Sequence, residues 1–266
     1  MTDLPADIKF RPMEPEDVKP ALRIIRQHNV DDFNVARQSY KKDIHGQYVL
    51  TKGAKVIGMT GWRLIGTADR GYWLSWTYLD EAERGQGLGT GVLEGLLNVF
   101  AGMKARKVFL TVSDQDAGPG EQGLYAKAIG VYKKVGFTEE VRHADYYDRG
   151  EAAIIMGLRI DDSYDPDPTD PEIRCALLTD VDEIVETDDA YFIDWRFDEG
   201  AGSSPEDLEA MVNRVRKWRG RVVFAGVASD ATSAQDLFGA VGFNEEGRLS
   251  DFYEDGVDEI HYRLDI

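Results

Sequence analysis

The first 160 residues alternate short apolar runs with amphipathic segments, as expected where strands alternate with helices. Apolar residues three and four positions apart predict a helix that begins at residue 17 and two more at 88–103 and 124–134. Runs rich in β-branched and aromatic residues predict strands at 8–11, 47–51, 55–65, 71–79, 108–112 and 152–159. Strands on both sides of helices, with an early hairpin, indicate a mixed sheet of the α/β or α+β class.

A segment rich in proline and acidic residues, 161–171, divides the chain. It holds five acids and three prolines in eleven residues, a composition that neither a helix interior nor an inner strand tolerates. We therefore expect a first domain at 1–160, an extended linker at 161–171 and a second domain at 172–266.

The two parts share an internal repeat. Residues 135–160 align without a gap with residues 241–266, and 12 of the 26 aligned positions are identical. Upstream, the offset changes from 106 to 115 and pairs residues 108–109 with 223–224. We expect the second part to be a shortened copy of the first. Only residues 173–184 remain for its opening strand and helix, and the early hairpin is missing.

Charge is distributed unevenly between the two parts. Residues 1–160 hold 22 basic and 21 acidic residues, whereas residues 161–266 hold 9 and 28, so their net charges are +1 and −19. The total of −18 argues against nucleic acid and anionic membranes as partners. The first part is therefore the better host for an anionic cofactor, although an acidic surface also serves solubility.

Composition sets further bounds. The 266 residues are 42% hydrophobic and 30% charged, as in soluble proteins with a packed core, and no run approaches the roughly 18 apolar residues of a membrane helix. The N-terminus has no apolar core, so we expect no secretory signal. The single cysteine, Cys175, excludes an internal disulfide, and we expect a cytoplasmic protein. The four histidines lack metal-ligand spacing, so no metal site is expected.

The segment with the clearest chemistry is Arg84-Gly85-Gln86-Gly87-Leu88-Gly89-Thr90, between an aromatic strand and an amphipathic helix. Glycines let a ligand approach the backbone, and the first N–H groups of a helix lack internal acceptors. Together with the helix dipole, these groups favour a phosphate or pyrophosphate. The dinucleotide fingerprint requires glycine where Thr90 and Val92 stand, and a P-loop requires a lysine that is missing here.

The pattern Arg-x-x-Gly-x-Gly in this segment resembles the coenzyme A pyrophosphate loop of the GCN5-related N-acetyltransferase (GNAT) family. The preceding strand, 78–84, fits the same resemblance, and residues 128–137 are similar to the family's Ala-x-x-x-Tyr-x-Lys-x-Gly-Phe signature. The resemblance covers most of residues 7–160. It implies a GNAT acyltransferase fold followed by a shortened second GNAT-like domain.

The resemblance also implies roles for individual residues. The cofactor is expected to be acetyl-CoA, its pyrophosphate bound by Arg84, Gly85, Gln86, Gly87, Leu88, Gly89 and Thr90. Leu79 is expected to offer backbone hydrogen bonds to the pantetheine arm and the thioester. Tyr132 matches the tyrosine that protonates the departing thiolate in many members. Tyr125 departs from the family pattern, because many relatives carry a cofactor-binding asparagine there.

The acceptor amine needs a proton acceptor and a pocket. Asp80, Glu81 or a water molecule can take the proton that the amine loses before attack. In this family the pocket is usually formed by the loop after the first helix and by the last hairpin. We therefore place four residues at the acceptor: Asp32, Phe33, Trp76 and Tyr146. Acidic and aromatic side chains suit a cationic amine.

The repeat predicts that the second half has lost this chemistry. It pairs Arg84 with Glu199, Gly89 with Ser204 and Tyr132 with Phe238. A carboxylate repels a pyrophosphate, and phenylalanine has no proton to donate. We therefore expect one acetyl-CoA per chain.

Three functions fit these features. The first is an N-acetyltransferase that passes acetyl from acetyl-CoA to a primary amine, of a small molecule or a peptide, by direct attack in a ternary complex. The second is a non-catalytic acyl-CoA sensor or interaction module. The third is a scaffold whose acidic half docks a basic protein. We expect either a monomer with two pseudo-dimeric halves or a homodimer.

Overall fold

The computed structural model describes residues 4–115, 123–161, 175–184, 187, 189–198 and 202–266. By its internal contacts the chain forms two compact units. Unit 1 comprises residues 1–110, 126–138 and 157–162, and unit 2 comprises residues 111–125, 139–156 and 163–266. Apart from Asp161, the expected linker lies outside the described residues. The domain boundaries at 160 and 172 remain a prediction.

The first sheet is mixed, which confirms the predicted fold class. In the described part of the chain it has eight strands in the order β1-β2-β3-β4-β6-β8-β7, with β5 paired to β3. The strands are β1 (Ile8–Pro12), β2 (Gln47–Lys52), β3 (Lys55–Leu64), β4 (Gly71–Leu74), β5 (Tyr78–Leu79), β6 (Lys107–Ser113), β7 (Thr138–Asp148) and β8 (Glu151–Arg159). Antiparallel pairing joins β1, β2 and β3, whereas β4 and β6 run parallel.

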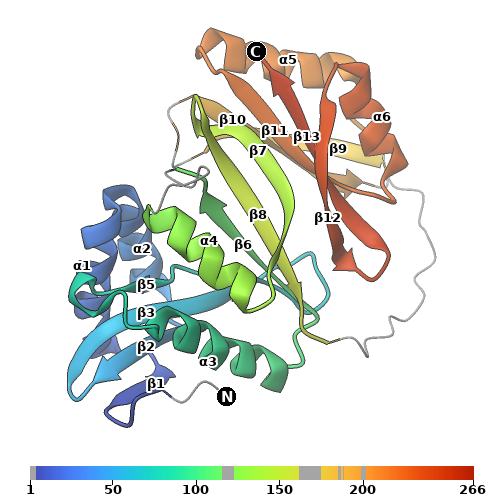
Figure 1. Ribbon diagram of the computed structural model, residues 1–266. Coiled ribbons are helices and arrows are strands. Elements are labelled where there is room, and N and C mark those ends of the chain that lie inside the picture. Colours follow the sequence, from blue (N-terminus) through green and yellow to red (C-terminus); the bar gives the residue numbers. More distant parts are fainter. Residues whose placement is uncertain (1–3, 116–122, 162–174, 185–186, 188, 199–201) are drawn as a thin grey trace. The chain divides into compact units, whose positions relative to one another are not determined.

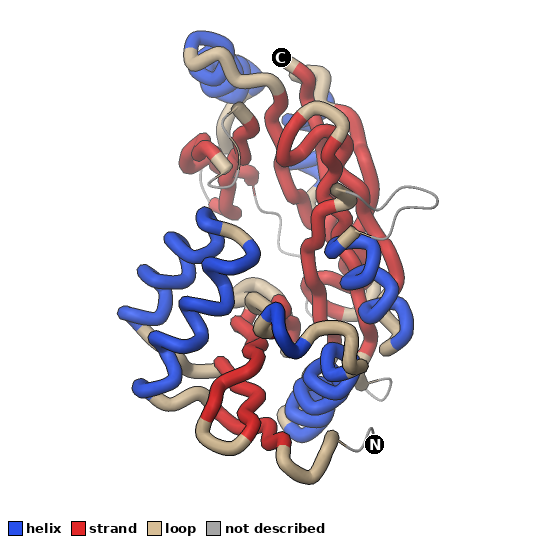
Figure 2. The backbone as a smooth tube through the Cα atoms, turned by 60° about the vertical axis from the view of Figure 1, so that its left-hand side comes forward, coloured by secondary structure: helices blue, strands red, loops and turns tan. Residues whose placement is uncertain are grey.

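Helices cover both faces of β2 and β3 in unit 1 (Figure 1). They are α1 (Val18–His28), α2 (Val30–Lys42) and α3 (Leu88–Gly102). Helix α4 (Leu124–Lys134) follows β6 along the chain, and short 3-10 turns lie at Pro15–Asp17 and Glu81–Glu83. Val49 and Met59 pack against α1 and α2, which lie side by side in Figure 2. Leu50 and Ile57 pack against the first turns of α3. Along β2 this division follows from the alternation of side chains. Along β3 it requires the irregularity at which one step of β2, from Leu50 to Thr51, opposes two steps of β3, so that Ile57 and Met59 lie on opposite faces.

Two predictions for unit 1 were wrong in detail. Asp31-Asp32-Phe33 lies in helix α2 instead of a loop, because the Asn29 side chain caps the helix by accepting from the N–H of Asp31 at 2.7 Å and of Asp32 at 3.1 Å. The predicted strand 71–79 is interrupted at residues 75–77. Trp62 faces Leu74 but Met59 faces Tyr78, so three steps along β3 oppose four along the partner strand. This extra residue is a β-bulge.

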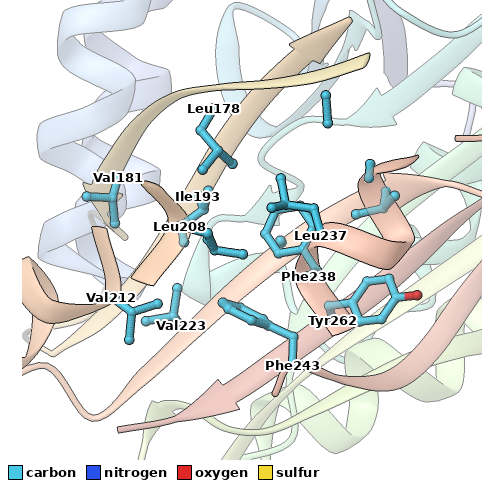
Figure 3. Packing of buried hydrophobic residues seen from close by; sticks show 14 of the residues in the cluster. Leu178, Val181, Ile193, Leu208, Val212, Val223, Leu237, Phe238, Phe243 and Tyr262 are labelled. Atoms are coloured by element: carbon cyan, nitrogen blue, oxygen red, sulfur yellow. The ribbon is translucent and has the colours of Figure 1, made fainter. Parts of the chain in front are cut away.

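Unit 2 contains a second sheet of five strands within the described residues, in the order β12-β13-β11-β10-β9. Its elements are β9 (Cys175–Glu183), β10 (Ala190–Asp198), α5 (Pro205–Lys217), β11 (Val222–Ala228), α6 (Thr232–Ala240), β12 (Asn244–Glu254) and β13 (Val257–Asp265). Helices α5 and α6 bury Leu208, Val212 and Phe238 against Ile193 and Val223 of the sheet (Figure 3).

The start of unit 2's sheet corrects another prediction. Residues 173–184 were expected to form an opening strand and a helix, but Cys175–Glu183 is one strand, β9, paired antiparallel with β10. The order β9-β10-β11-β13-β12 therefore parallels β3-β4-β6-β8-β7 of the first sheet. In both sheets a helix connects two parallel strands, β4 to β6 and β10 to β11.

Segments that match in sequence also make matching backbone contacts. The N–H of Phe137 donates to the Tyr132 carbonyl at 3.1 Å, and the N–H of Phe243 donates to the Phe238 carbonyl at 3.2 Å. In the hairpins that follow, Asp145 and Asp251 have φ values of 52° and 49°. Each carboxylate accepts from the N–H of a glycine five residues later. That the second half is a GNAT-like copy remains a prediction, and these contacts support it.

Reciprocal contacts join β7 to β12 inside unit 2. The Glu246 carboxylate accepts from the N–H of Ala144 at 3.2 Å, and the Glu140 carboxylate accepts from the N–H of Ser250 at 2.9 Å. Glu140 aligns with Glu246, and Ala144 with Ser250, at the repeat offset of 106. Exchanged contacts of this kind mark an isologous, two-fold arrangement of the two strands. Among the described residues, no helix is long and apolar enough to cross a membrane.

Candidate functional site

The glycine-rich loop leads directly into α3, as the sequence predicted. Gly85 and Gly87 have φ values of 77° and 78°, in the left-handed region that favours glycine. Gly87 is the residue before the first turn of α3, and no side chain caps that turn. The first N–H groups of α3 thus lack the side-chain acceptor that commonly satisfies a helix N-terminus.

The space in front of this turn is open. A Cβ atom placed on Gly85 or Gly87 meets no protein atom within 4 Å. At Gly89 the nearest atoms, from Leu79 and Val131, are 4.0 Å away. An uncapped helix N-terminus with room before it, next to the Arg84 guanidinium, suits a multiply charged anion. The residues present therefore fit the pyrophosphate of coenzyme A.

Arg84 and Leu79 meet at a residue that the sequence reading treated as ordinary, His28. Nε2 of His28 lies 2.9 Å from the Leu79 carbonyl oxygen and 2.7 Å from Nη2 of Arg84. The Nε of Arg84 also donates to the Leu79 carbonyl at 3.4 Å. Burial, and next the nearby Arg84 cation, hold the pKa of His28 below its usual value. His28 is thus a neutral imidazole beside the loop at neutral pH.

The Leu79 side chain helps to form the apolar floor of the site. It packs with Ile57 and Leu88. A Cβ on Gly58 would lie 2.6 Å from its Cδ2 atom and 3.2 Å from the Tyr78 carbonyl oxygen, so a larger residue at that point of β3 would displace the Leu79 side chain. The predicted backbone partner Leu79 is therefore held firmly beside α3, and its carbonyl already contacts His28 and Arg84.

Asp32 and Trp76, both predicted at the acceptor, lie together. Trp76 donates from Nε1 to Asp32 Oδ1 at 3.1 Å, and the Tyr78 hydroxyl donates to the other carboxylate oxygen. Tyr40 packs edge-on against Trp76 with ring centroids 5.7 Å apart. The Tyr78 ring in turn lies 4.3 Å from that of His28. An acidic group is thus surrounded by aromatic rings within unit 1.

Phe33 packs against the same apolar cluster as Trp76 and Tyr78. Phe33 carries the guanidinium groups of Arg26 and Arg37 over its ring, at 5.4 and 5.7 Å from the centroid. Tyr146 belongs to unit 2, where its ring lies 5.3 Å from that of Phe224. The acceptor roles of Phe33 and Tyr146 remain predictions.

Tyr132 lies on α4, in unit 1 with the loop. Its ring is partly buried and packs edge-on against Phe137 at 6.0 Å. Burial raises the pKa of Tyr132 to about 12. The hydroxyl therefore stays protonated at physiological pH, as a proton donor must.

Asp80 is engaged in structural contacts. Its carboxylate accepts from the N–H of Ala82 at 3.2 Å and lies 3.4 Å from Nζ of Lys55. Although burial acts in the opposite direction, these two partners hold the pKa of Asp80 below its usual value. A carboxylate held in this way is a weak base, and the choice among Asp80, Glu81 and a water molecule as proton acceptor remains a prediction. In the described part of the chain, no three His, Cys, Asp or Glu residues are grouped to hold a metal ion.

Comparison with known proteins bears on residues of unit 1. The sequence model of the "Acetyltransferase (GNAT) family" matches residues 16–137. A GNAT-family protein from Desulfovibrio desulfuricans matches the structure with a TM-score of 0.51 at 20% identity, over 58% of this chain and 99% of that one. Ard1 from Thermoplasma volcanium matches with a TM-score of 0.49 at 19% identity, over 59% and 100%.

A third solved structure, the ribosomal-protein-S18-alanine N-acetyltransferase from Escherichia coli, matches with a TM-score of 0.48 at 21% identity, over 61% of this chain and 99% of that one. No curated protein matches the sequence. The first match shows a shared fold, and the family model adds the sequence pattern of the loop and α4. Residues 16–137 are therefore a domain of the GNAT acetyltransferase family.

Proposed function

We propose that the chain transfers the acetyl group of acetyl-CoA to a primary amine by direct attack in a ternary complex. The observation that carries the proposal is the uncapped N-terminus of α3, open in front of Gly85 and Gly87, inside a GNAT-family domain. Direct attack requires both substrates to be bound together, and the loop and the Asp32 cluster both belong to unit 1.

Different residues of unit 1 bind the cofactor and donate the proton in this proposal. Backbone N–H groups of Gln86–Thr90, with Arg84, bind the pyrophosphate, and Leu79 orients the arm that leads to the thioester. The cofactor, when bound, supplies the acetyl thioester. The protonated Tyr132 hydroxyl gives its proton to the departing thiolate, which prevents re-attack of the thiolate on the product.

The acceptor is proposed to be a cationic amine. The Asp32 carboxylate receives hydrogen bonds from Trp76 and Tyr78, which hold it in place and leave its negative charge intact. Trp76 and Tyr78 are the aromatic side chains that contact it, and Tyr40 packs edge-on against Trp76; an ammonium bound beside the carboxylate can contact the faces of these rings. A carboxylate with aromatic walls therefore favours an ammonium over a neutral or anionic acceptor.

The test is thiol release from acetyl-CoA in the presence of a panel of amines, including polyamines, aminoglycosides and peptides with a free N-terminus. We expect turnover with cationic primary amines. Asp32→Asn should raise the KM for the amine tenfold or more, since a charge-assisted interaction contributes roughly 1.5–3 kcal/mol. Asp31→Asn, an exposed neighbour in the same helical turn, should leave the KM unchanged and is the matched control.

The alternative function, a sensor that binds acyl-CoA without turnover, uses the same loop. Binding of acetyl-CoA in calorimetry with no thiol release across the whole panel would favour it. A lack of acetyl-CoA binding would contradict both functions.

A further inference from the structure

The two aromatic residues that contact Asp32, Trp76 and Tyr78, lie on the face of the sheet that regular alternation would not give them. Tyr72 of β4 faces α3, because its ring lies 5.6 Å from that of Phe100 in that helix. Residues two apart along a strand share a face, so the even-numbered residues that follow would face α3 as well. Instead, Trp76 and Tyr78 pack with the apolar cluster of α1 and α2, and both donate to Asp32.

The bulge between β4 and β5 produces this change of face. Three steps along β3 oppose four along the strand that carries the aromatic residues, so one extra residue lies before Tyr78. A slip of one residue turns the side chains of a strand to the other face of its sheet. Trp76 and Tyr78 therefore reach Asp32 only while the extra residue keeps its place.

Two hydroxyl groups hold the backbone at the bulge. Oγ1 of Thr77 donates to the Ser75 carbonyl at 3.0 Å and lies 2.8 Å from Oγ1 of Thr60 on β3. A hydroxyl has one proton to donate, and Thr77 gives its proton to Ser75. Thr60, which is fully buried, is therefore the donor to Thr77.

The hydroxyl pair forms only in the bulged register. Without the extra residue, Thr60 would oppose Trp76 instead of Thr77, and its buried hydroxyl would lose this acceptor. A buried polar group without a partner costs free energy, so the pair favours the bulged register over the slipped one. Cross-strand threonine pairs of this kind stabilise sheets in general.

The two threonines act through the backbone. Thr60 is adjacent to Met59, which packs against α1 and α2, so the Thr60 side chain points to the opposite face of β3. Beyond the bulge, the chain is tied to β3 independently, because the N–H of Asp80 donates to the Ile57 carbonyl at 2.8 Å. A change in the hydroxyl pair therefore affects the aromatic residues before it affects the glycine-rich loop.

We propose that Thr60 and Thr77 are positioning residues for the acceptor, whose paired hydroxyls keep the bulge in register and so hold Trp76 and Tyr78 against Asp32. The inference rests on the proposed function, in which Asp32 binds the ammonium group of the amine. It adds a requirement that the carboxylate alone does not carry: the amine site depends on the register of the strand beside it.

Kinetics with the fastest amine of the panel are the first test. Thr77→Val leaves the Ser75 carbonyl and the Thr60 hydroxyl without partners, whereas Thr60→Val removes only the outer donor. We expect the KM for the amine to rise roughly tenfold or more in Thr77→Val and about threefold in Thr60→Val. The kcat at saturating amine and the Kd for coenzyme A should stay within about twofold of wild type.

Matched variants separate positioning from general packing. Thr60→Ser and Thr77→Ser keep the hydroxyls and should retain the wild-type KM. Thr51→Val removes the hydroxyl of another buried threonine of the same sheet and should also leave the KM unchanged.

The second test needs no substrate. Indole ¹H–¹⁵N spectra of the full-length protein report on its five tryptophans, and Trp76→Phe assigns the signal of the Nε1–H group that donates to Asp32. Thr77→Val should move this signal toward its position in Asp32→Asn, while the signals of Trp195 and Trp218 in unit 2 stay in place.

Either an unmoved Trp76 signal or an unchanged KM in Thr77→Val would overturn the inference while leaving acetyl transfer intact. If Thr77→Val does not fold, Thr60→Val carries the same two readouts. If no amine is acetylated, the proposed function fails, and the Trp76 signal still decides whether the hydroxyl pair positions the indole.

Discussion

The helices α3 and α5 begin in opposite ways, although both connect parallel strands of their sheets. The turn before α3 is formed by Gly87, with no side-chain cap and open space in front. At α5, the Ser204 side chain accepts from the N–H of Asp207 at 3.3 Å, and the Asp207 carboxylate accepts from the N–H of Ser204 at 2.8 Å. The protein's own carboxylate thus occupies the position that an anionic ligand would take.

The parallel strands of the two sheets differ as well. In β10 the Trp195 indole donates to the Gly226 carbonyl of β11 at 2.7 Å, so a side chain ties the two strands together beyond their paired residues. In unit 1, Trp76 instead donates to Asp32. The position of the bulge also differs. In unit 2 the extra residue lies in β9, because one step along β10, from Asp194 to Trp195, opposes two steps along β9. In unit 1 the extra residue instead lies in the strand segment that precedes the loop.

The residue that we propose as proton donor differs too. Phe238 occupies the position equivalent to Tyr132 and is fully buried in the core of unit 2. One half of the repeat has an open anion site and a hydroxyl, whereas the other has a closed helix end and a phenyl ring. The comparison teaches that side-chain capping distinguishes the two helix N-termini, and that the uncapped one leaves its first N–H groups available to an anion.

The largest expected effect comes from closing the first loop. Gly87→Glu should weaken acetyl-CoA binding by at least about 100-fold, because a carboxylate would enter the site and the left-handed φ of 78° disfavours a side chain. Gly202→Glu, at the aligned position of the second half, should leave the affinity and a stoichiometry of one per chain unchanged. Calorimetric titration measures both. Wild-type affinity in Gly87→Glu, or two sites per wild-type chain, would contradict the comparison.

The next effect concerns the hydroxyl that Phe238 lacks. Tyr132→Phe should keep acetyl-CoA affinity and lower turnover by roughly 10²–10⁴-fold. Because its pKa is raised to about 12, Tyr132 should contribute no loss of rate on the alkaline side until the pH approaches that value. Tyr48→Phe, a change in a ring that stacks on Phe10 at 5.1 Å, is the control. Equal turnover in both variants, with chemistry rate-limiting, would assign Tyr132 to packing.

The sequence predicted the loop, α3, α4 and the mixed sheet because each depends on local signals: glycine spacing, helical periodicity and apolar runs. Asp32 and Trp76, two of the four residues predicted at the acceptor, are in contact, whereas their acceptor role remains a prediction. The capped start of α2 was readable from Asn29 and the acids that follow it, but the short apolar pattern of that helix obscured it.

His28 could not be predicted in the same way. It lies 56 residues from Arg84 and 51 from Leu79 along the chain, and no local pattern marks it as different from His45. Its importance arises from burial and from partners that only the fold brings near.

Several residues of the comparison between the two halves, Glu199 and Gly200 among them, lie outside the described residues. The expected repulsion between Glu199 and a pyrophosphate therefore remains a prediction.

A smaller effect is expected from opening the second helix. Ser204→Ala should lower the free energy of unfolding by about 0.5–2 kcal/mol, the usual contribution of an N-cap, and should not change acetyl-CoA affinity. Denaturant unfolding followed by calorimetry measures both quantities. A new acetyl-CoA site in this variant would show that the cap alone closes unit 2.

The smallest expected effect is on the pH dependence of the free energy of unfolding. It concerns His143, which aligns with Leu249 in the second half of the repeat. His143 is buried, donates from one ring nitrogen toward Glu246 and lies 2.8 Å from a nitrogen of His261 through the other. Burial lowers the pKa of His143 from its ordinary value of 6.5, against the effect of Glu246 and with that of His261 and Arg263.

Because the folded protein binds this proton less tightly than the unfolded chain, stability is complete above pH 6.5 and falls as the pH drops below it toward the lowered folded-state value. His143→Leu, which copies the residue at 249, should flatten that slope. It should also lower stability at pH 8, since Glu246 loses a partner while keeping Arg263 at 3.3 Å. Urea unfolding at pH 8, 6.5 and 5.5 measures both changes, and an equal slope in the two proteins would place the acid sensitivity elsewhere in unit 2.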